Sequence, residues 1–152
     1  MASSNAFWLD LESAPVGSQH DFSKAIDQLV FNEQGLITAI AQQFDTGEVL
    51  MLAWMNRESL LISLQEQRAC YWSRSRNRLW RKGESSGQVQ SLKGLRIDCD
   101  GDALLLSVDQ QGPACHTGRK SCFYLGLNHL DLKEGQLEIL NAPEIDPASL
   151  YK

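Results

Sequence analysis

The sequence lacks two features that mark exported and membrane-spanning proteins. No basic residue precedes Lys24, and Asp10 and Glu12 are acidic, so the amino terminus does not resemble a secretory signal. The longest apolar run, residues 49–55, is far shorter than the roughly 20 residues that cross a bilayer. These absences predict a cytoplasmic protein whose four cysteines stay reduced.

The chain also lacks an excess of basic residues, internal repeats and low-complexity tracts. Its net charge of −5 argues against broad nucleic-acid binding. With 152 residues and 43% apolar content, it can bury one core without disulfides. We therefore expect a single domain over residues 21–152. Residues 1–20, which are small and polar with Pro15 and Gly17, are expected to form a loose lead-in.

One helix is predicted from its own signals. Asn56 is a good N-cap, residues 57–67 favour helix, and Leu60, Leu61 and Leu64 form an apolar stripe. Short β-compatible runs separated by turn residues fill most of the rest. The expected strands span residues 36–44, 49–55, 69–75, 79–82, 95–100, 103–109, 122–127 and about 137–140. The sum is an α+β fold with mainly antiparallel strands.

Three carboxylates alternate in Asp98, Asp100 and Asp102, around Cys99 and Gly101. Such a cluster repels itself unless a cation neutralises it, and oxygen ligands suit Mg²⁺ or Ca²⁺. An acidic, solvated hairpin turn is the simpler alternative. If residues 96–100 form a strand, both of its aspartates share one face and the cysteine points to the other, which predicts two separate metal positions.

Three thiols, Cys99, Cys115 and Cys122, are candidate ligands for one zinc ion, and His116 lies beside the middle one. Three protein ligands leave a fourth position for water, as in catalytic zinc sites. The spacing fits no common zinc finger, and buried structural thiols are the alternative. The loop setting of Cys115 favours metal. His116 is then a candidate acid/base, and Cys70 is left as a structural thiol.

Cations and indoles gather between residues 68 and 83, where six basic residues occur without an acid. Guanidinium groups suit phosphate, and indole faces stack on purines. The pattern predicts one phosphorylated small ligand, with residues 84–87 as a polar loop facing it. An exposed hairpin bearing ordinary arginines is the alternative. The candidate substrate-binding residues are Trp72, Ser73, Arg74, Ser75, Arg76, Trp80 and Lys82.

Taken together and in order, these blocks resemble the phosphoribosyl-AMP cyclohydrolase family. The matching stretches are GEVLMLAWMN at 47–56, YWSRSR at 71–76, LWRKG at 79–83, SG at 86–87, DCDGDALL at 98–105, ACHTG at 114–118 and SCF at 121–123. The resemblance covers about residues 29–124. It implies the third step of histidine biosynthesis, in which a zinc-bound hydroxide opens the adenine ring of 1-(5-phosphoribosyl)-AMP at the N1–C6 bond.

The resemblance also assigns residues. It implies one Zn²⁺ per subunit at Cys99, Cys115 and Cys122, and His116 as the catalytic acid/base. It implies Mg²⁺ at Asp98, Asp100 and Asp102. Arg74, Arg76 and Lys82 are the candidates for binding phosphate. It further implies an intertwined homodimer whose active sites use both subunits, with no nucleic-acid or membrane partner.

Three other functions are weighed against this one. A zinc deaminase uses similar chemistry, but its H-x-E…P-C-x-x-C signature is missing. A zinc-stabilised RNA-binding module would use the basic segment, against which the net charge counts. A structural zinc domain would need a fourth protein ligand, and the candidates are His116, awkwardly next to Cys115, and Cys70.

Overall fold

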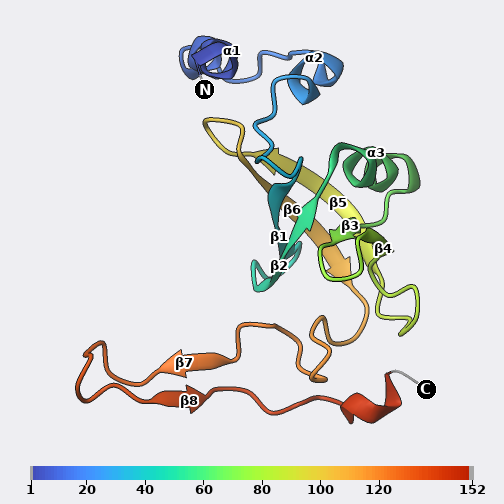
Figure 1. Ribbon diagram of the computed structural model, residues 1–152, viewed down its shortest axis with the longest axis vertical. Helices are drawn as coiled ribbons and strands as arrows, with labels where there is room; N and C mark the ends of the chain where they lie inside the picture. The colour runs from blue at the N-terminus through green and yellow to red at the C-terminus, as the bar shows by residue number, and fades with distance from the viewer. Residues whose placement is uncertain (1, 151–152) are drawn as a thin grey trace.

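The computed structural model describes residues 2–150, and a four-stranded sheet forms its centre (Figure 1). The sheet order is β2–β1–β6–β5, from β1 (Ile37–Gln43), β2 (Val49–Met55), β5 (Gln90–Ile97) and β6 (Ala103–Gln110). Its inner face carries Ala39, Ala41, Leu104 and Leu106, which are almost fully buried. The α+β class with mainly antiparallel strands is confirmed.

The strands expected at residues 36–44 and 49–55 form the hairpin of β1 and β2. The two strands pair antiparallel from Ile37 opposite Met55, and the turn closes where Gly47 adopts a positive φ of 79°. One pairing was not expected: β1 runs parallel to β6, with Ile40 opposite Leu105. The alternation of side chains within a strand does not indicate which strand will pair with it. β6 is separated from the β1–β2 hairpin in sequence by α3, β3, β4 and β5.

Helix α3 (Arg57–Glu66) begins where the sequence predicts. The Asn56 side chain accepts from the Ser59 backbone N–H at 2.8 Å, and the Ser59 hydroxyl accepts from the Asn56 N–H at 2.9 Å, which closes a capping box. The predicted apolar stripe is partly wrong. Leu60 is buried, but Leu61 is 46% exposed, and the small Ser63 lies against the body in its place.

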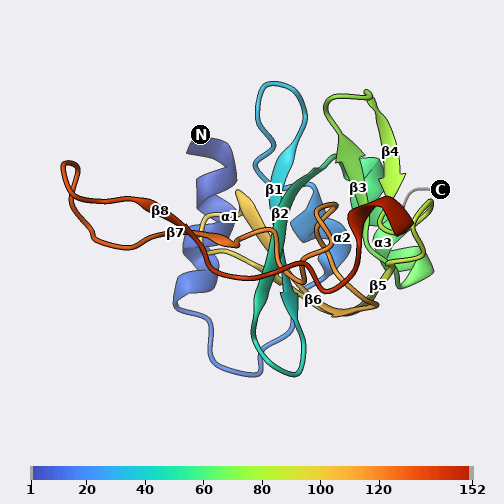
Figure 2. The ribbon, with the colours of Figure 1, turned by 90° about the horizontal axis from the view of Figure 1, so that it is seen from below.

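The prediction of a loose lead-in is wrong, and two helices form between residues 2 and 26 in addition to the predicted one. Residues Ala2–Glu12 form helix α1 and Phe22–Ile26 form α2 (Figure 2). Trp8 anchors this region: it is 7% exposed, and its indole N–H donates to the Gln28 carbonyl at 2.9 Å. Burial of this one aromatic ring therefore anchors the amino-terminal segment to the body, although most residues of the segment are small or polar.

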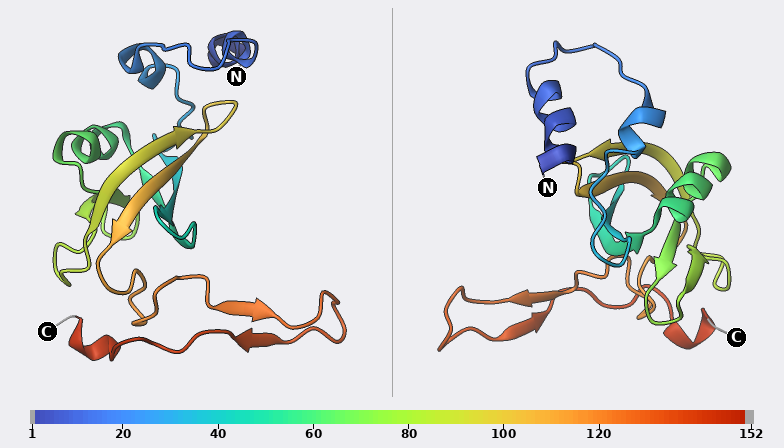
Figure 3. Two further views of the ribbon diagram at one scale, coloured as in Figure 1. Left: turned by 180° about the vertical axis from the view of Figure 1, so that it is seen from behind. Right: turned by 45° about the horizontal axis from the view of Figure 1, so that its top comes forward.

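Two small ribbons complete the fold. β3 (Cys70–Ser73) pairs with β4 (Arg78–Arg81) beside α3, and β7 (Leu125–Leu127) pairs with β8 (Leu137–Ile139). The β7–β8 ribbon projects from the body as an arm (Figure 3). A short 3-10 helix spans Pro147–Ser149. Among the described residues, no helix is both long and apolar enough to cross a membrane.

Candidate active site

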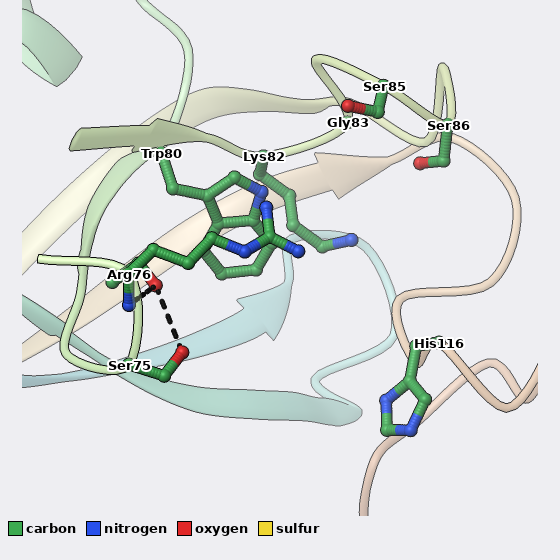
Figure 4. A pocket seen from close by; sticks show the side chains of 9 residues that line it. Ser75, Arg76, Trp80, Lys82, Gly83, Ser85, Ser86 and His116 are labelled. Atoms are coloured by element: carbon green, nitrogen blue, oxygen red, sulfur yellow. Dashed lines mark hydrogen bonds between the residues drawn. The ribbon is translucent and has the colours of Figure 1, made fainter. Parts of the chain in front are cut away.

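The basic residues of the β3–β4 hairpin open onto a cavity of about 470 Å³. Figure 4 shows Arg76, Trp80 and Lys82 projecting into it from the hairpin, with His116 across from them on the 111–120 loop. The lining residues are Ser73, Ser75, Arg76, Trp80, Lys82, Gly83, Ser85, Ser86 and His116. The structure thus brings together segments that lie more than 30 residues apart in the chain.

The hairpin divides the predicted substrate-binding residues between two cavities. Trp72 and Ser73 are neighbours in β3, so their side chains point to opposite faces. Trp72, together with Arg74 in the turn after β3, lines a second cavity of about 340 Å³. There the Arg74 guanidinium carbon lies 5.0 Å from the centre of the Trp54 ring. Five of the seven predicted residues therefore share a cavity with His116, and two do not.

Lys82 is the most unusual cation in the first cavity, because it is only 3% exposed. Its ammonium lies 5.6 Å from the centre of the Trp80 ring, and among residues 2–150 it makes no ion pair with a carboxylate. Burial lowers the pKa of Lys82, and the neighbouring Cys122 and Cys115 oppose that change. A buried ammonium without an anion nearby is well placed to receive a phosphorylated or otherwise anionic ligand.

Cys115 and Cys122 lie next to each other and near Lys82. The Cys115 loop is fixed by its backbone N–H, which donates to Arg119 O at 3.0 Å, and the Thr117 hydroxyl donates to Cys115 Sγ at 3.1 Å. The Cys122 N–H donates to Leu50 O at 2.8 Å. Desolvation first, and the adjacent Cys115 second, raise the pKa of Cys122 to about 12.

These two thiols fit a soft metal ion. A thiol with a raised pKa stays protonated and unreactive, whereas a bound metal cation deprotonates it and makes it a ligand. The Cys115–Cys122 pair supplies two sulfurs of the three that the sequence suggests. The pair alone leaves the metal short of the three ligands of a catalytic site.

Cys99 does not join them within one chain. It is exposed in the turn that precedes β6, whereas Cys115 follows the far end of that strand. The eight residues of β6 extend for about 26 Å. Among the described residues, the metal-sized grouping of side chains is instead Asp98, Asp100 and Asp102. The expectation that three thiols converge is therefore not met inside a single molecule.

The three carboxylates do gather, with ligand oxygens within 4.8 Å of one another. The predicted strand through residues 96–100 is wrong, because β5 ends at Ile97 and residues 98–102 form a turn. Gly101 sits at φ 77°, and a Cβ there would meet the Trp8 ring at 2.3 Å. Strand alternation therefore does not place Cys99, and the acidic side chains meet because the chain reverses.

Hydrogen bonds shape the acidity of this turn. Asp98 Oδ1 accepts from the backbone N–H groups of Asp102 at 2.9 Å and Ala103 at 3.1 Å. Desolvation opposes, but these bonds and the Asp102 side chain together lower the pKa of Asp98. Hydrogen bonding with Asp98 first, and then with Asp100, raises the pKa of Asp102 to about 6. The turn thus has the oxygen donors and the unbalanced charge that a hard divalent cation would satisfy.

Some lining residues were not singled out in the sequence as site residues. Ser85 and Ser86 line the first cavity. The sequence predicted that the loop at residues 84–87 faces the ligand, but it did not single out either serine. Asn77 lines the second cavity and has a left-handed backbone conformation, with φ 54°. In the sequence, this residue indicates only the turn of a hairpin. Cys70 is fully buried in β3, as expected of a structural thiol.

Comparisons with known proteins agree with this geometry. The family model described as phosphoribosyl-AMP cyclohydrolase matches residues 51–124. The chain is 63% identical to a phosphoribosyl-AMP cyclohydrolase of Alkalilimnicola ehrlichii over 93% of this chain and 96% of the relative. It is 57% identical to that of Hydrogenovibrio crunogenus over 93% of both, and 64% identical to that of Magnetococcus marinus over 81% and 92%. The chain therefore belongs to the phosphoribosyl-AMP cyclohydrolase family of enzymes.

Proposed function

We propose that this enzyme opens the adenine ring of 1-(5-phosphoribosyl)-AMP by hydrolysis of the N1–C6 bond, the third step of histidine biosynthesis in the cytoplasm. The observation that carries the proposal is the single cavity in which Arg76, Lys82 and Trp80 face His116. A phosphorylated purine needs cations for phosphate and an aromatic face for its base. It also needs a proton-transfer group beside the bond that breaks.

Each lining group has a part that its chemistry suits. Arg76 and Lys82 bind phosphate oxygens, and the buried Lys82 gains most because water does not compete for its charge. Trp80 stacks on the purine and orients C6. His116 takes a proton from the attacking water and delivers one to N1 as that nitrogen departs. The serines of the hairpin and of the 84–87 loop donate to the remaining phosphate and ribose oxygens.

The proposal includes one zinc ion per subunit, held by Cys115 and Cys122 and by Cys99 of a second copy. Zinc supplies a Lewis acid that lowers the pKa of bound water to about 7. The adjacent pair of sulfurs and the distant, exposed Cys99 support a site built between two molecules. A homodimer then carries two such sites, related by symmetry.

Magnesium is proposed at Asp98, Asp100 and Asp102. Their gathered oxygens and the raised pKa of Asp102 support a divalent cation there. Because the same turn carries Cys99, a second copy that delivers the thiol also delivers this cation to the substrate's phosphates. Neutralised carboxylates no longer repel the anionic substrate, which is the role we assign to the metal.

The test is a spectrophotometric assay with phosphoribosyl-AMP, run on protein as purified and after treatment with a chelator. We expect ring opening that the chelator removes and that zinc together with magnesium restores. Ammonia release is measured alongside, because a deaminase frees ammonia and keeps the ring closed. Turnover that persists without metal would contradict the zinc assignment, and ammonia in place of the opened product would contradict the reaction itself.

A further inference from the structure

The two segments that flank the first cavity leave the central sheet at the same place. Segment 82–89 supplies four of the residues that line the cavity, and it leads into β5 at Gln90. Segment 111–120 supplies His116 and follows β6 directly after Gln110. The two glutamines face each other in the register of β5 and β6. Figure 4 shows the imidazole across the cavity from the serines of the first segment, so the separation of the segments sets the width of the site.

The side chain of Gln110 bridges these two segments. Its amide nitrogen donates to Gln88 O at 3.0 Å in the first segment and to Gln111 O at 2.9 Å in the second. A carbonyl oxygen only accepts hydrogen bonds, so both N–H groups of the amide are used and the amide can point only one way. One side chain therefore joins two stretches of backbone that belong to different loops.

A chain of buried side chains holds that amide from behind. The Gln90 amide nitrogen donates to Gln110 Oε1 at 2.8 Å, and the Tyr71 hydroxyl donates to Gln90 Oε1 at 2.7 Å. Gln90 and Tyr71 are fully buried, so a bond lost here leaves an interior polar group unpaired. The Tyr71 ring lies 5.7 Å from the ring of Trp80, which lines the cavity. The chain thus runs from a wall of the cavity to both of its loops.

The two segments also approach each other closely along their backbones. The Gln111 N–H donates to Val89 O at 2.9 Å. Gly112 has a φ of 66°, and a Cβ at this position would overlap the side-chain amide of Gln88. A larger residue would push the segments apart, which indicates that their separation is determined by specific contacts.

We propose that Gln110 is a positioning residue of the active site, which holds segments 82–89 and 111–120 at a fixed separation. The inference rests on the proposed function in one respect, namely that the first segment binds phosphate and His116 transfers protons. Gln110 does not line the cavity and acts through the two segments. It keeps the imidazole aligned with a substrate that is held on the opposite segment, and a displacement of about 1 Å in such an alignment can cost about 100-fold in rate.

Gln43 provides a matched control in the same part of the sheet. Its Oε1 accepts from the Gln110 backbone N–H at 3.0 Å, and its amide nitrogen donates to Asp109 Oδ1 at 3.1 Å. Gln43 is buried, and both of these bonds end on β6. Its replacement therefore removes two side-chain hydrogen bonds from the end of β6 and leaves the carbonyls of both segments paired.

The test compares Gln110→Met with Gln43→Met in the full-length, metal-loaded enzyme. Methionine is close to glutamine in length and donates no hydrogen bond. Both variants should lose some thermal stability, since each loses hydrogen bonds at the end of the sheet. Only Gln110→Met should lower kcat, by about 10- to 100-fold, with KM within about threefold of wild type because the phosphate-binding groups remain. An equal loss of kcat in both variants, or none in Gln110→Met, overturns the positioning role.

Hydrogen exchange separates a shift of the segments from loss of folding. In Gln110→Met the amides of both segments should exchange faster than in wild type, whereas those of the central sheet should not. Unchanged exchange in the folded variant overturns the proposal. If the variant does not fold, native-state exchange of wild-type protein decides, because segments held by one clamp should open together with one free energy and one denaturant dependence.

Separate opening of the two segments in wild type also overturns the proposal. Failure of the proposed function gives a different result: wild-type protein then does not open the ring, while the two segments still exchange as one unit and Gln110→Met still loosens both.

Discussion

The two ends of the β5–β6 hairpin carry opposite chemistry. At the turn, hard oxygen donors gather on a reversal of the chain, and they are exposed and mutually repelling. Beyond the other end, a buried ammonium and an imidazole line one cavity, and two soft thiols lie near that ammonium. Oxygen donors are the ligands that hard cations prefer, and thiols are those that zinc prefers, so the proposed magnesium and zinc belong to different ends.

The difference teaches that the residues proposed to bind metals fall at opposite ends of one hairpin. Cys99 is a soft ligand placed at the hard end. The proposed function gives Cys99 a role only in a dimer, where it would meet the Cys115–Cys122 pair of a second copy. Substitutions at either end therefore test whether the two ends act in one active site.

The largest effect is expected when a thiol is removed from either end. Changing an outer-shell partner of a metal typically costs 10- to 100-fold in affinity or activity, so loss of a ligand should exceed about 100-fold. Cys115→Ser and Cys99→Ser should therefore lose zinc and turnover alike, measured by metal analysis and the ring-opening assay. Cys70→Ser, at a buried thiol outside the site, is the control for zinc content. A wild-type zinc content in Cys99→Ser would show that Cys99 is not a ligand of the zinc held by Cys115 and Cys122.

Removing the imidazole should be nearly as costly but should leave the metals in place. His116→Asn is expected to lower kcat by about 100-fold or more, the usual range for a general acid/base, with KM little changed. His129→Asn, at an exposed histidine of the arm, is the control. A large rise in KM with normal kcat would instead assign His116 to binding.

Removing the buried ammonium should weaken substrate binding. Lys82→Met keeps the length of the side chain and removes its charge, and we expect kcat/KM to fall about 10- to 100-fold, the value of one or two charge-assisted contacts. Lys24→Met, at an exposed lysine, should change nothing. The loss should appear mainly in KM, and an unchanged KM would remove Lys82 from the phosphate site.

The smallest effect concerns the acidic end without metal. The pKa of Asp102 is raised to about 6 in the folded chain, so its contribution to stability is present at acid pH and is lost as pH rises through about 6. Metal-free wild type should therefore melt progressively below metal-free Asp102→Asn as pH rises from about 4 to 6, and the difference should level off above that range. Added Mg²⁺ should stabilise wild type more than the variant. Parallel melting curves would show that the carboxylates do not repel one another.

Local signals in the sequence predicted the local structure well. The N-cap at Asn56 was recognisable, because its hydrogen bond involves residues close in sequence. The anchoring role of Trp8 was missed because it depends on contacts with Gln28 and Gly101, which lie near Trp8 only in the folded chain. The parallel pairing of β1 with β6 was missed for the same reason.

The candidate site was predicted in its residue types but not in its arrangement. Arg76, Trp80, Lys82 and His116 share a cavity, whereas Trp72 and Arg74 line another, because the β3–β4 hairpin and its turn present side chains to two sides. The division of the thiols was also beyond the sequence. Spacing along a chain says little about which residues meet across a long hairpin, and nothing about a second molecule.

Mixing two inactive variants tests the central claim most directly. Cys99→Ser and Cys115→Ser are each expected to lack turnover, but a heterodimer of the two restores one complete site. Random pairing after co-refolding should recover about a quarter of wild-type activity and zinc, since half of the dimers are mixed and each has one intact site of two. No recovery from folded, mixed dimers would contradict an active site shared between two copies.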